Sequence, residues 1–120
     1  MDAGGSHIFL FDRFRLDRRG GLFQCFDGAA PVPINIGSRA LEMLMILVEH
    51  GGNLVSKDEI LAAVWPKTIV DEANLSVQIS ALRRVLDQGR SGKSCIQTVP
   101  GRGYRLALYG DAGHQLFVAG

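Results

Sequence analysis

The sequence predicts an α+β fold in which short strands come first, helices follow and a hairpin closes the domain. Three observations lead to this prediction. Between residues 8 and 36, short aromatic and β-branched runs alternate with turn residues, which is typical of strands. Between residues 38 and 87, apolar residues recur at helical intervals. Between residues 96 and 108, two alternating runs flank a Pro/Gly turn, as in a β-hairpin.

The first part of the chain is expected to form an N-terminal four-stranded antiparallel sheet. The strands are expected at residues 8–11, 14–17, 22–26 and 32–36. The segments between them are rich in Asp, Arg and Gly, which favours tight turns. Pro33 has no N–H to donate to a strand ladder, so the last strand is expected at an edge.

Two helices are expected next. The first begins at the N-cap candidate Ser38 and ends before Gly51 and Gly52. The second opens with a capping box at residues 56–59, in which Ser56 and Glu59 satisfy each other's backbone N–H groups. Pro66 is expected to end it, because a proline cannot continue a helix.

The third helix is expected over residues 74–87. Leu75, Ile79, Leu82 and Leu86 form one apolar stripe along it. The side chains that point away from this stripe are Ser76, Val77, Ser80, Ala81, Arg83 and Arg84. Small side chains let another surface approach closely, and the arginines suit an anionic surface.

Charge is divided unevenly along the chain, although the formal net charge is only +1. Residues 1–73 contain seven basic and ten acidic side chains, for a net charge of −3. Residues 74–108 contain six basic side chains and one acidic, for a net charge of +5, and residues 109–120 contribute −1. Such asymmetry indicates a nucleic-acid or other anionic partner.

Several other classes of protein are excluded or disfavoured. The longest apolar run, residues 43–48, is far shorter than the roughly 20 residues of a membrane span, and the first residues lack the pattern of a signal peptide. Two cysteines cannot make a disulfide framework and lack metal-ligand spacing, so we expect reduced thiols, no metal, no cofactor and a cytoplasmic location. The Gly101-x-Gly103 pair lacks the third glycine of a dinucleotide fingerprint, and no catalytic constellation is present, so the chain is not expected to be an enzyme.

The predicted elements together make a winged helix-turn-helix, with the C-terminal β-hairpin as the wing. A helix of this kind enters the major groove of DNA while cationic and hydroxyl groups bind phosphates on either side. Ser76 and Ser80 can contact bases or phosphates, and Val77 can touch a thymine methyl. Arg102, between two glycines at the hairpin tip, suits a phosphate or the minor groove.

The sequence resembles the winged-helix DNA-binding domain of OmpR/PhoB-type bacterial transcriptional regulators over about residues 8–108. The most specific match is residues 96–106, which carry that family's Thr-Val, Gly-x-Gly and Tyr-Arg wing signature. Residues 55–65 and 77–86 support the match. Ser80 and Ala81 stand where many relatives carry basic residues, and Pro100 stands at a wing position that is often Arg.

The resemblance implies a sequence-specific DNA-binding domain, with a recognition helix at residues 74–87 in the major groove and a wing at residues 96–108 on phosphate or the minor groove. By matching position, the DNA-binding residues are Trp65, Asn74, Ser76, Val77, Gln78, Ser80, Arg83, Arg84, Thr98, Arg102 and Tyr104. The loop from Pro66 to Ala73 matches the segment that can touch RNA polymerase, which makes Lys67, Thr68, Asp71 and Glu72 candidate polymerase contacts.

The sequence also predicts the domain organisation of the chain and leaves one alternative function open. We expect one domain at residues 8–108 between flexible segments at 1–7 and 109–120. Most response regulators place a phosphoacceptor receiver domain first, whereas here the module starts within ten residues of Met1. The chain is therefore either a fragment of a larger regulator or a stand-alone protein, expected to act as a dimer or as tandem copies on double-stranded DNA. The alternative is a winged helix used for protein–protein contact, which predicts an apolar outer helix face.

Overall fold

The computed structural model of the chain describes residues 8–11, 13–18, 20–26, 28–88, 94–107 and 117–119. The chain divides into two compact units: a strand unit, Met1–Ile36 with Leu108–Gly120, and a helical unit, Gly37–Ala107. The expected flexible segment at residues 1–7 lies outside the described residues, as does the expected flexible segment at 109–120 apart from 117–119.

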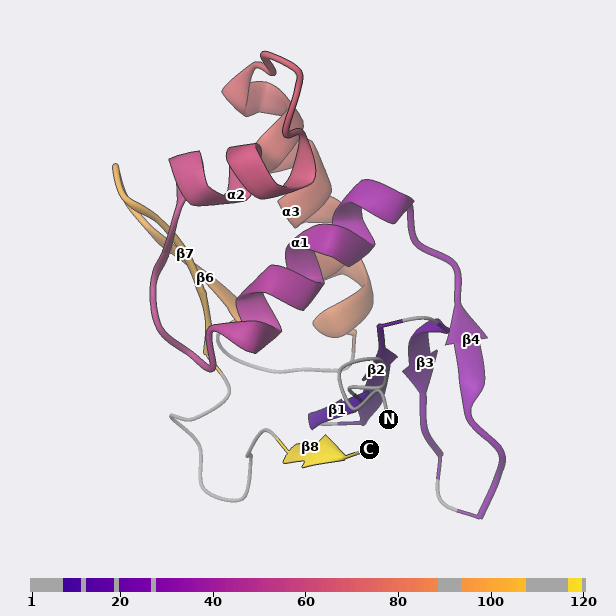
Figure 1. Cartoon of the computed structure of the whole chain (residues 1–120). Helices are drawn as coiled ribbons and strands as arrows, with labels where there is room; N and C mark the ends of the chain where they lie inside the picture. The colour runs from indigo at the N-terminus through magenta and orange to yellow at the C-terminus, as the bar shows by residue number, and fades with distance from the viewer. Residues whose placement is uncertain are drawn as a thin grey trace, which may run out of the picture. The chain divides into compact units, whose positions relative to one another are not determined.

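The strand unit is an antiparallel sheet (Figure 1). It consists of β1 (Ile8–Phe11), β2 (Phe14–Asp17), β3 (Gly21–Gln24), β4 (Val32–Ile34) and β8 (Phe117–Ala119), in the order β4-β3-β2-β1-β8. The predicted four-stranded sheet is therefore confirmed, with β4 at an edge and a fifth strand added. The third and fourth strands end two residues earlier than expected, at Gln24 and Ile34.

Alternation of side chains fixes the buried face of this sheet. Phe9 and Phe11 on β1 are buried, as are Phe14 and Leu16 on β2. Phe9 lies opposite Leu16, and Phe11 lies opposite Phe14 with ring centroids 5.8 Å apart. Cross-strand aromatic and aliphatic pairs of this kind hold the register, because a slip of one residue would expose every one of them.

Strand β8 differs from the flexible tail expected at residues 109–120. Residues 117–119 pair antiparallel with β1, with Ala119 opposite Ile8. Three residues are too few to show a strand period, and the pairing depends on the free edge of a strand more than a hundred residues earlier. The sequence in the neighbourhood of β8 therefore could not predict it.

The helical unit holds the three predicted helices and the hairpin. Its elements are α1 (Ser38–Glu49), β5 (Val55–Ser56), α2 (Lys57–Val64), α3 (Glu72–Leu86), β6 (Ile96–Val99) and β7 (Gly103–Leu106). Helix α1 packs against α2, α3 and β7, and the two hairpin strands run side by side (Figure 1). Fully buried aliphatic side chains of all three helices supply the core, among them Leu44, Leu47, Ile60, Leu75 and Leu82. No helix in the described ranges is long and apolar enough to cross a membrane.

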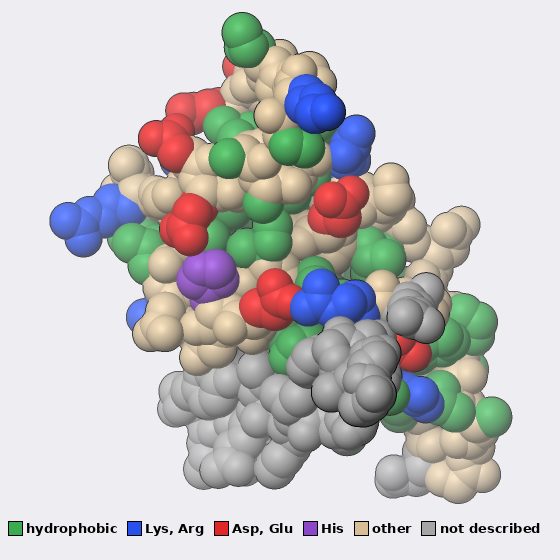
Figure 2. Space-filling view, in the orientation of Figure 1, with side chains coloured by type: hydrophobic (Ala, Val, Ile, Leu, Met, Phe, Trp, Pro, Cys, Tyr) green, Lys and Arg blue, Asp and Glu red, His purple; other side chains and the backbone are tan. Residues whose placement is uncertain are grey.

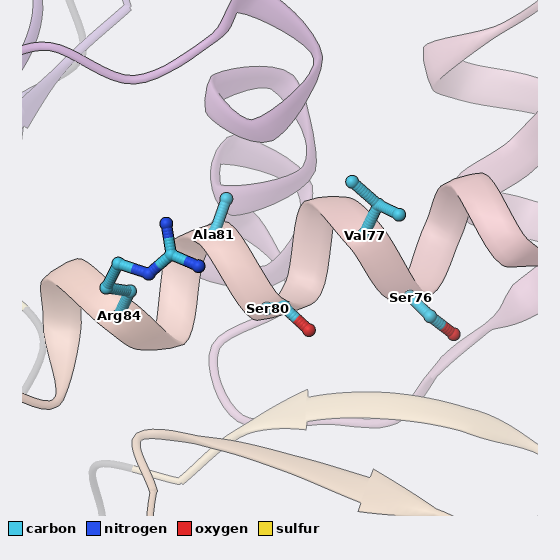
Figure 3. A pocket seen from close by; sticks show the side chains of 5 residues that line it. All are labelled: Ser76, Val77, Ser80, Ala81 and Arg84. Atoms are coloured by element: carbon cyan, nitrogen blue, oxygen red, sulfur yellow. The ribbon is translucent and has the colours of Figure 1, made fainter.

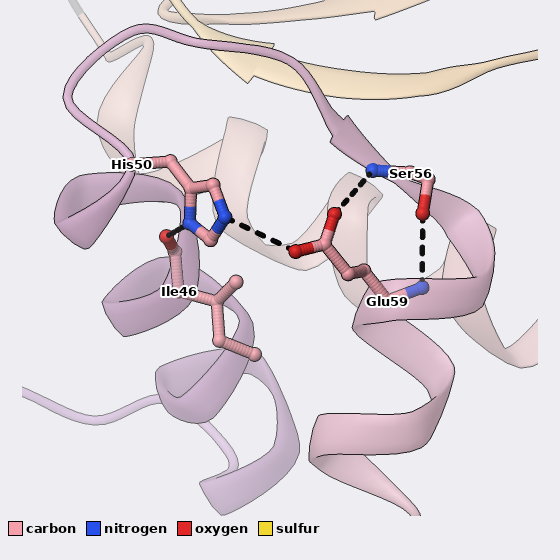
Figure 4. A network of polar contacts seen from close by, with 4 residues as sticks. All are labelled: Ile46, His50, Ser56 and Glu59. Atoms are coloured by element: carbon pink, nitrogen blue, oxygen red, sulfur yellow. Dashed lines mark hydrogen bonds and ion pairs between the residues drawn. The ribbon is translucent and has the colours of Figure 1, made fainter.

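A polar network links the end of α1 to the start of α2 (Figure 4). The predicted capping box is confirmed: the Ser56 hydroxyl accepts from the Glu59 N–H at 3.1 Å, and the Glu59 carboxylate accepts from the Ser56 N–H at 3.5 Å. The same carboxylate lies 3.3 Å from Nε2 of His50, whose Nδ1 lies 2.9 Å from the Ile46 carbonyl. The predicted N-cap of α1 is wrong by one residue, because Gly37 occupies the cap without a side-chain bond.

Helix α3 begins two residues before the predicted start at Asn74 and ends at Leu86, one residue before the predicted end. Asp71 is its N-cap, and its carboxylate accepts from the Ala73 N–H at 3.4 Å. An aspartate in this position satisfies a backbone donor that would otherwise be unpaired, so the helix starts directly after it. The predicted apolar stripe is confirmed, with Leu75, Ile79, Leu82 and Leu86 buried.

The hairpin belongs to a three-stranded sheet with the order β5-β7-β6. The two-residue strand β5 was not predicted, and β7 runs from residue 103 to 106, within the hairpin expected at residues 96–108. Ser56 of β5 lies opposite Gly103 of β7. The sheet therefore joins the wing to the N-terminus of α2.

Candidate nucleic-acid interface

The outward face of α3 forms an open pocket of about 330 Å³ (Figure 3). Its lining consists of Ser76, Val77, Ser80, Ala81 and Arg84. Five of the six side chains that the sequence placed outward are therefore together on one surface. Ser76, Val77, Ser80 and Arg84 are exposed, and Ala81 is half-buried.

The chemistry of this face suits a close approach by a partner with both apolar and anionic features. Val77 is 60% exposed, although an apolar side chain is stabilised by burial and not by contact with water. Two serine hydroxyls lie beside it, and Arg84 forms no hydrogen bond or ion pair with another described residue. Gln78 is half-buried at the margin of this face.

Arg83, the sixth outward candidate, points to the wing instead. Its Nε and Nη2 donate to the Ile96 carbonyl at 3.1 and 2.8 Å, and Nη2 also donates to the Thr98 hydroxyl at 2.8 Å. The guanidinium therefore joins α3 to β6. A charged donor with three such bonds contributes more to holding the wing than an exposed arginine would.

The aromatic candidates are also engaged within the protein. Tyr104 is only 6% exposed, in the strand between β5 and β6. Trp65 is half-buried, with the Arg39 guanidinium 5.8 Å from its ring centroid. Arg39 also donates to the Val64 carbonyl at 2.6 Å, at the C-terminus of α2. No sequence pattern indicates that Arg39 contacts Trp65, because this contact depends on the packing of α1 against α2.

The wing tip presents one exposed arginine on a fixed backbone. Arg102 is exposed, and its carbonyl accepts from the Lys57 N–H at 3.2 Å, at the start of α2. Gly101 before it has a φ of +74°, which a side chain rarely tolerates. Arg105 on β7 is a further exposed cation that the candidate set omitted, although the alternation of β7 would have placed it opposite buried Tyr104 and Leu106.

The loop between α2 and α3 exposes part of the predicted polymerase-contact set. Lys67 and Thr68 are exposed, and Ile69, which was not a candidate, is fully exposed. Asp71 caps α3, and Glu72 accepts from the Lys57 ammonium at 3.2 Å. Asn74, a DNA-binding candidate, is exposed in the first turn of α3.

Charges differ between the faces of the helical unit. Figure 2 looks onto α1 and α2, where Asp and Glu side chains lie over the surface among Lys and Arg. The pocket on α3, by contrast, contains Arg84 and no carboxylate. In the parts of the chain that the structure describes, no group of three His, Cys, Asp or Glu side chains could hold a metal ion.

Comparison with known proteins identifies the family. The family model described as "Transcriptional regulatory protein, C terminal" matches residues 32–106, more than half of the chain. The chain belongs to this OmpR/PhoB-type family. The three helices and the hairpin of this chain lie within the matched segment.

Individual relatives agree with this assignment. Transcriptional regulator HilA of Salmonella typhimurium is 36% identical over 98 residues, 82% of this chain and 17% of HilA. The solved DNA-binding domain of E. coli CadC has a TM-score of 0.67 at 25% identity, over 82% of this chain and 90% of that one. The DNA-binding domain of CpxR from E. coli has a TM-score of 0.65 at 27% identity, over 82% and 94%.

The comparisons also set the scale of the match. The chain spans only 17% of HilA and 15% of the transcriptional activator CadC of E. coli, which is 34% identical over 76 residues. It spans nearly the whole of the isolated DNA-binding domains. The likeness therefore concerns one domain of the longer regulators. The family and these relatives are transcriptional regulators and indicate no enzymatic activity.

Proposed function

We propose that this OmpR/PhoB-type domain binds double-stranded DNA sequence-specifically, as part of a bacterial transcriptional regulator in the cytoplasm. Helix α3 enters the major groove with Ser76, Val77, Ser80 and Arg84 towards the bases, and the wing places Arg102 on phosphate or in the minor groove. Asn74, Gln78 and Arg105 lie at the margins of the contact. Arg83, Thr98, Trp65 and Tyr104 contribute mainly by holding the wing and helices in position.

The observation that carries this proposal is the exposed face of α3, which is lined by Arg84 without a carboxylate, and Arg84 has no partner among the described residues. A face meant for solvent alone would favour long Lys and Glu side chains that pair along the helix. A face meant for an apolar protein partner would not present an arginine that has no partner among the described residues, since an unpaired charge is costly to bury. The phosphate-lined major groove accommodates both the small side chains and the cation.

Titration of duplex DNA at two salt concentrations tests the proposal. Fragments enriched by the chain from a random duplex library should bind with an affinity that falls steeply with salt, because each neutralised phosphate releases counterions. The double variant Arg84→Ala/Arg102→Ala should lose most of this affinity, whereas Arg13→Ala, an exposed arginine of the strand unit, should retain it. Absence of binding at low salt, or binding indifferent to salt and to the double variant, would reject the proposal.

A second contact is proposed for the loop between α2 and α3. This loop has an exposed surface suited to RNA polymerase, formed by Lys67, Thr68 and Ile69. Asp71 and Glu72 add negative charge to it. A transcription assay with Ile69→Asp should lose activation while DNA affinity stays at the wild-type level. Unchanged activation in that variant would reject the contact.

A further inference from the structure

The pocket on α3 contains two side chains whose chemistry differs enough to discriminate bases. We infer, on the basis of the proposed function, that Val77 reads a thymine methyl and Arg84 reads a guanine about three base pairs away. The target of the recognition helix would then contain at least one T and one G at that spacing, both read in the major groove.

Val77 has the exposure that a methyl contact requires. It is 60% exposed on the face away from the core, and Ala81, one turn further along the helix, extends the same apolar edge. Figure 3 shows Val77 and Ala81 along one edge of this face and the hydroxyls of Ser76 and Ser80 along the other edge. The C5 methyl of thymine is the apolar group that a base presents in the major groove, so an exposed valine in that groove favours thymine.

Arg84 is the cation available for base reading on this face. Its neighbour Arg83 already donates to Ile96 and Thr98, whereas Arg84 has no partner among the described residues. In Figure 3 its guanidinium turns towards Ala81, over the same face as Val77. A planar guanidinium donates two parallel bonds to O6 and N7 of guanine, a pattern that no other base offers.

The separation of the two side chains sets the spacing of the bases. Val77 and Arg84 are seven residues apart, so they lie nearly in line along the helix, about 10 Å apart. Successive base pairs rise about 3.4 Å along B-DNA, so this distance matches about three steps. Ser76 and Ser80 can donate to or accept from any base edge, so they permit close approach without selecting a base.

The experiment begins with the whole chain and a random duplex library, and ends with single-atom changes in the enriched site. Deoxyuridine replaces each enriched thymine and removes only the methyl. Replacing guanine by 7-deazaguanine removes only N7. We expect the loss of the methyl to weaken wild-type binding about fourfold, and the loss of N7 to weaken it by about fivefold or more.

The inference is decided by combining each base change in the DNA with a substitution in the protein. In Val77→Ala the deoxyuridine penalty should disappear, and in Arg84→Ala, which has no donor left to reach N7, the 7-deazaguanine penalty should disappear. Ser76→Ala is the matched control and should keep both penalties. Penalties that persist in Val77→Ala and Arg84→Ala would overturn the inference while leaving DNA binding intact. If the library yields no enriched sequence, the proposed function itself fails.

Discussion

At the scale of single residues, Arg83 and Arg84 show how neighbouring side chains of one type acquire different tasks. Arg83 is half-buried and donates to two residues of β6, whereas Arg84 is exposed on the pocket. Helical geometry places them 100° apart, enough for one to meet the wing and the other to face outward. Of the two arginines, Arg83 therefore joins α3 to β6, and Arg84 is exposed with no partner among the described residues.

Substitution of each arginine should separate these tasks. Arg83→Ala should lower the free energy of unfolding by about 1–2 kcal/mol, because it removes charge-assisted bonds from the carbonyl of Ile96, a fully buried residue. Arg84→Ala should change the free energy of unfolding by no more than about 0.5 kcal/mol, as exposed substitutions usually do. Urea titration of both variants measures the difference. Equal losses in the two variants would contradict the division of tasks.

The sequence predicted the exposed face of α3 better than it predicted the remaining site residues. Helical periodicity alone places Ser76, Val77 and Ser80 opposite the apolar stripe. The partners of Arg83 and Trp65 depend on contacts between elements that are far apart in the chain, on β6 and α1 respectively. No local pattern carries that information, so the sequence could only treat these side chains as candidates for DNA.

At the scale of elements, the capping box at the start of α2 also anchors the wing. Ser56 caps the helix and pairs in β5, opposite Gly103. Ser56→Ala should lower the free energy of unfolding by about 1 kcal/mol, because the Glu59 N–H loses its acceptor. Ser56→Thr retains the hydroxyl and should stay close to wild type in the same thermal or urea unfolding measurement. Similar losses in both variants would show that the hydroxyl bond is not the cause.

The close pairing of β5 with β7 requires a glycine at position 103. A Cβ on Gly103 would overlap the Val55 carbonyl oxygen and lie 2.9 Å from the Ser56 Cα, both of which are backbone atoms that cannot rotate away. Gly103→Ala should therefore cost about 3 kcal/mol of unfolding free energy, at the upper end for overpacking.

Gly37→Ala is the control for this effect, because nothing lies within 4 Å of its added Cβ. It occupies the N-cap of α1, where alanine costs about 1 kcal/mol or less relative to glycine. Comparison of the two midpoints in urea isolates the steric term. A Gly103→Ala chain as stable as Gly37→Ala would show that β5 and β7 can separate at little cost.

The elements whose signal lies in their own sequence were predicted, and two strands that form only against distant partners were not. Helices α1, α2 and α3 and the strands of the meander all follow from apolar spacing and capping residues. Strands β5 and β8 contain two and three residues and form against strands distant in sequence. The start of α3 was misplaced because Asp71 was interpreted as part of the preceding loop rather than as its cap.

At the scale of the whole molecule, a net charge of +1 limits what one copy can do on DNA. A domain with so little excess positive charge is expected to hold a single DNA site weakly at physiological salt. A duplex with two enriched sites in tandem should therefore bind at least about tenfold more tightly than a duplex with one site, as linked binding events reinforce each other.

Band-shift titration with one-site and two-site duplexes measures this difference, and the number of shifted species gives the stoichiometry. A two-site duplex in which one site carries deoxyuridine and 7-deazaguanine is the control and should revert towards the one-site affinity. Equal affinities for one-site and two-site duplexes would contradict the need for a second copy.

The hydrogen bonds that hold the wing in place have a consequence for the shape of the bound DNA. The Arg83 side chain holds β6 to α3, and the Lys57 N–H holds the tip of the wing to the start of α2. The distance from the recognition helix to the wing tip is therefore rigid, and a duplex must adapt its groove width to match it. Sequences that narrow or bend easily between the two contacts pay less elastic energy. Base pairs that no side chain touches would then contribute to the choice of binding site.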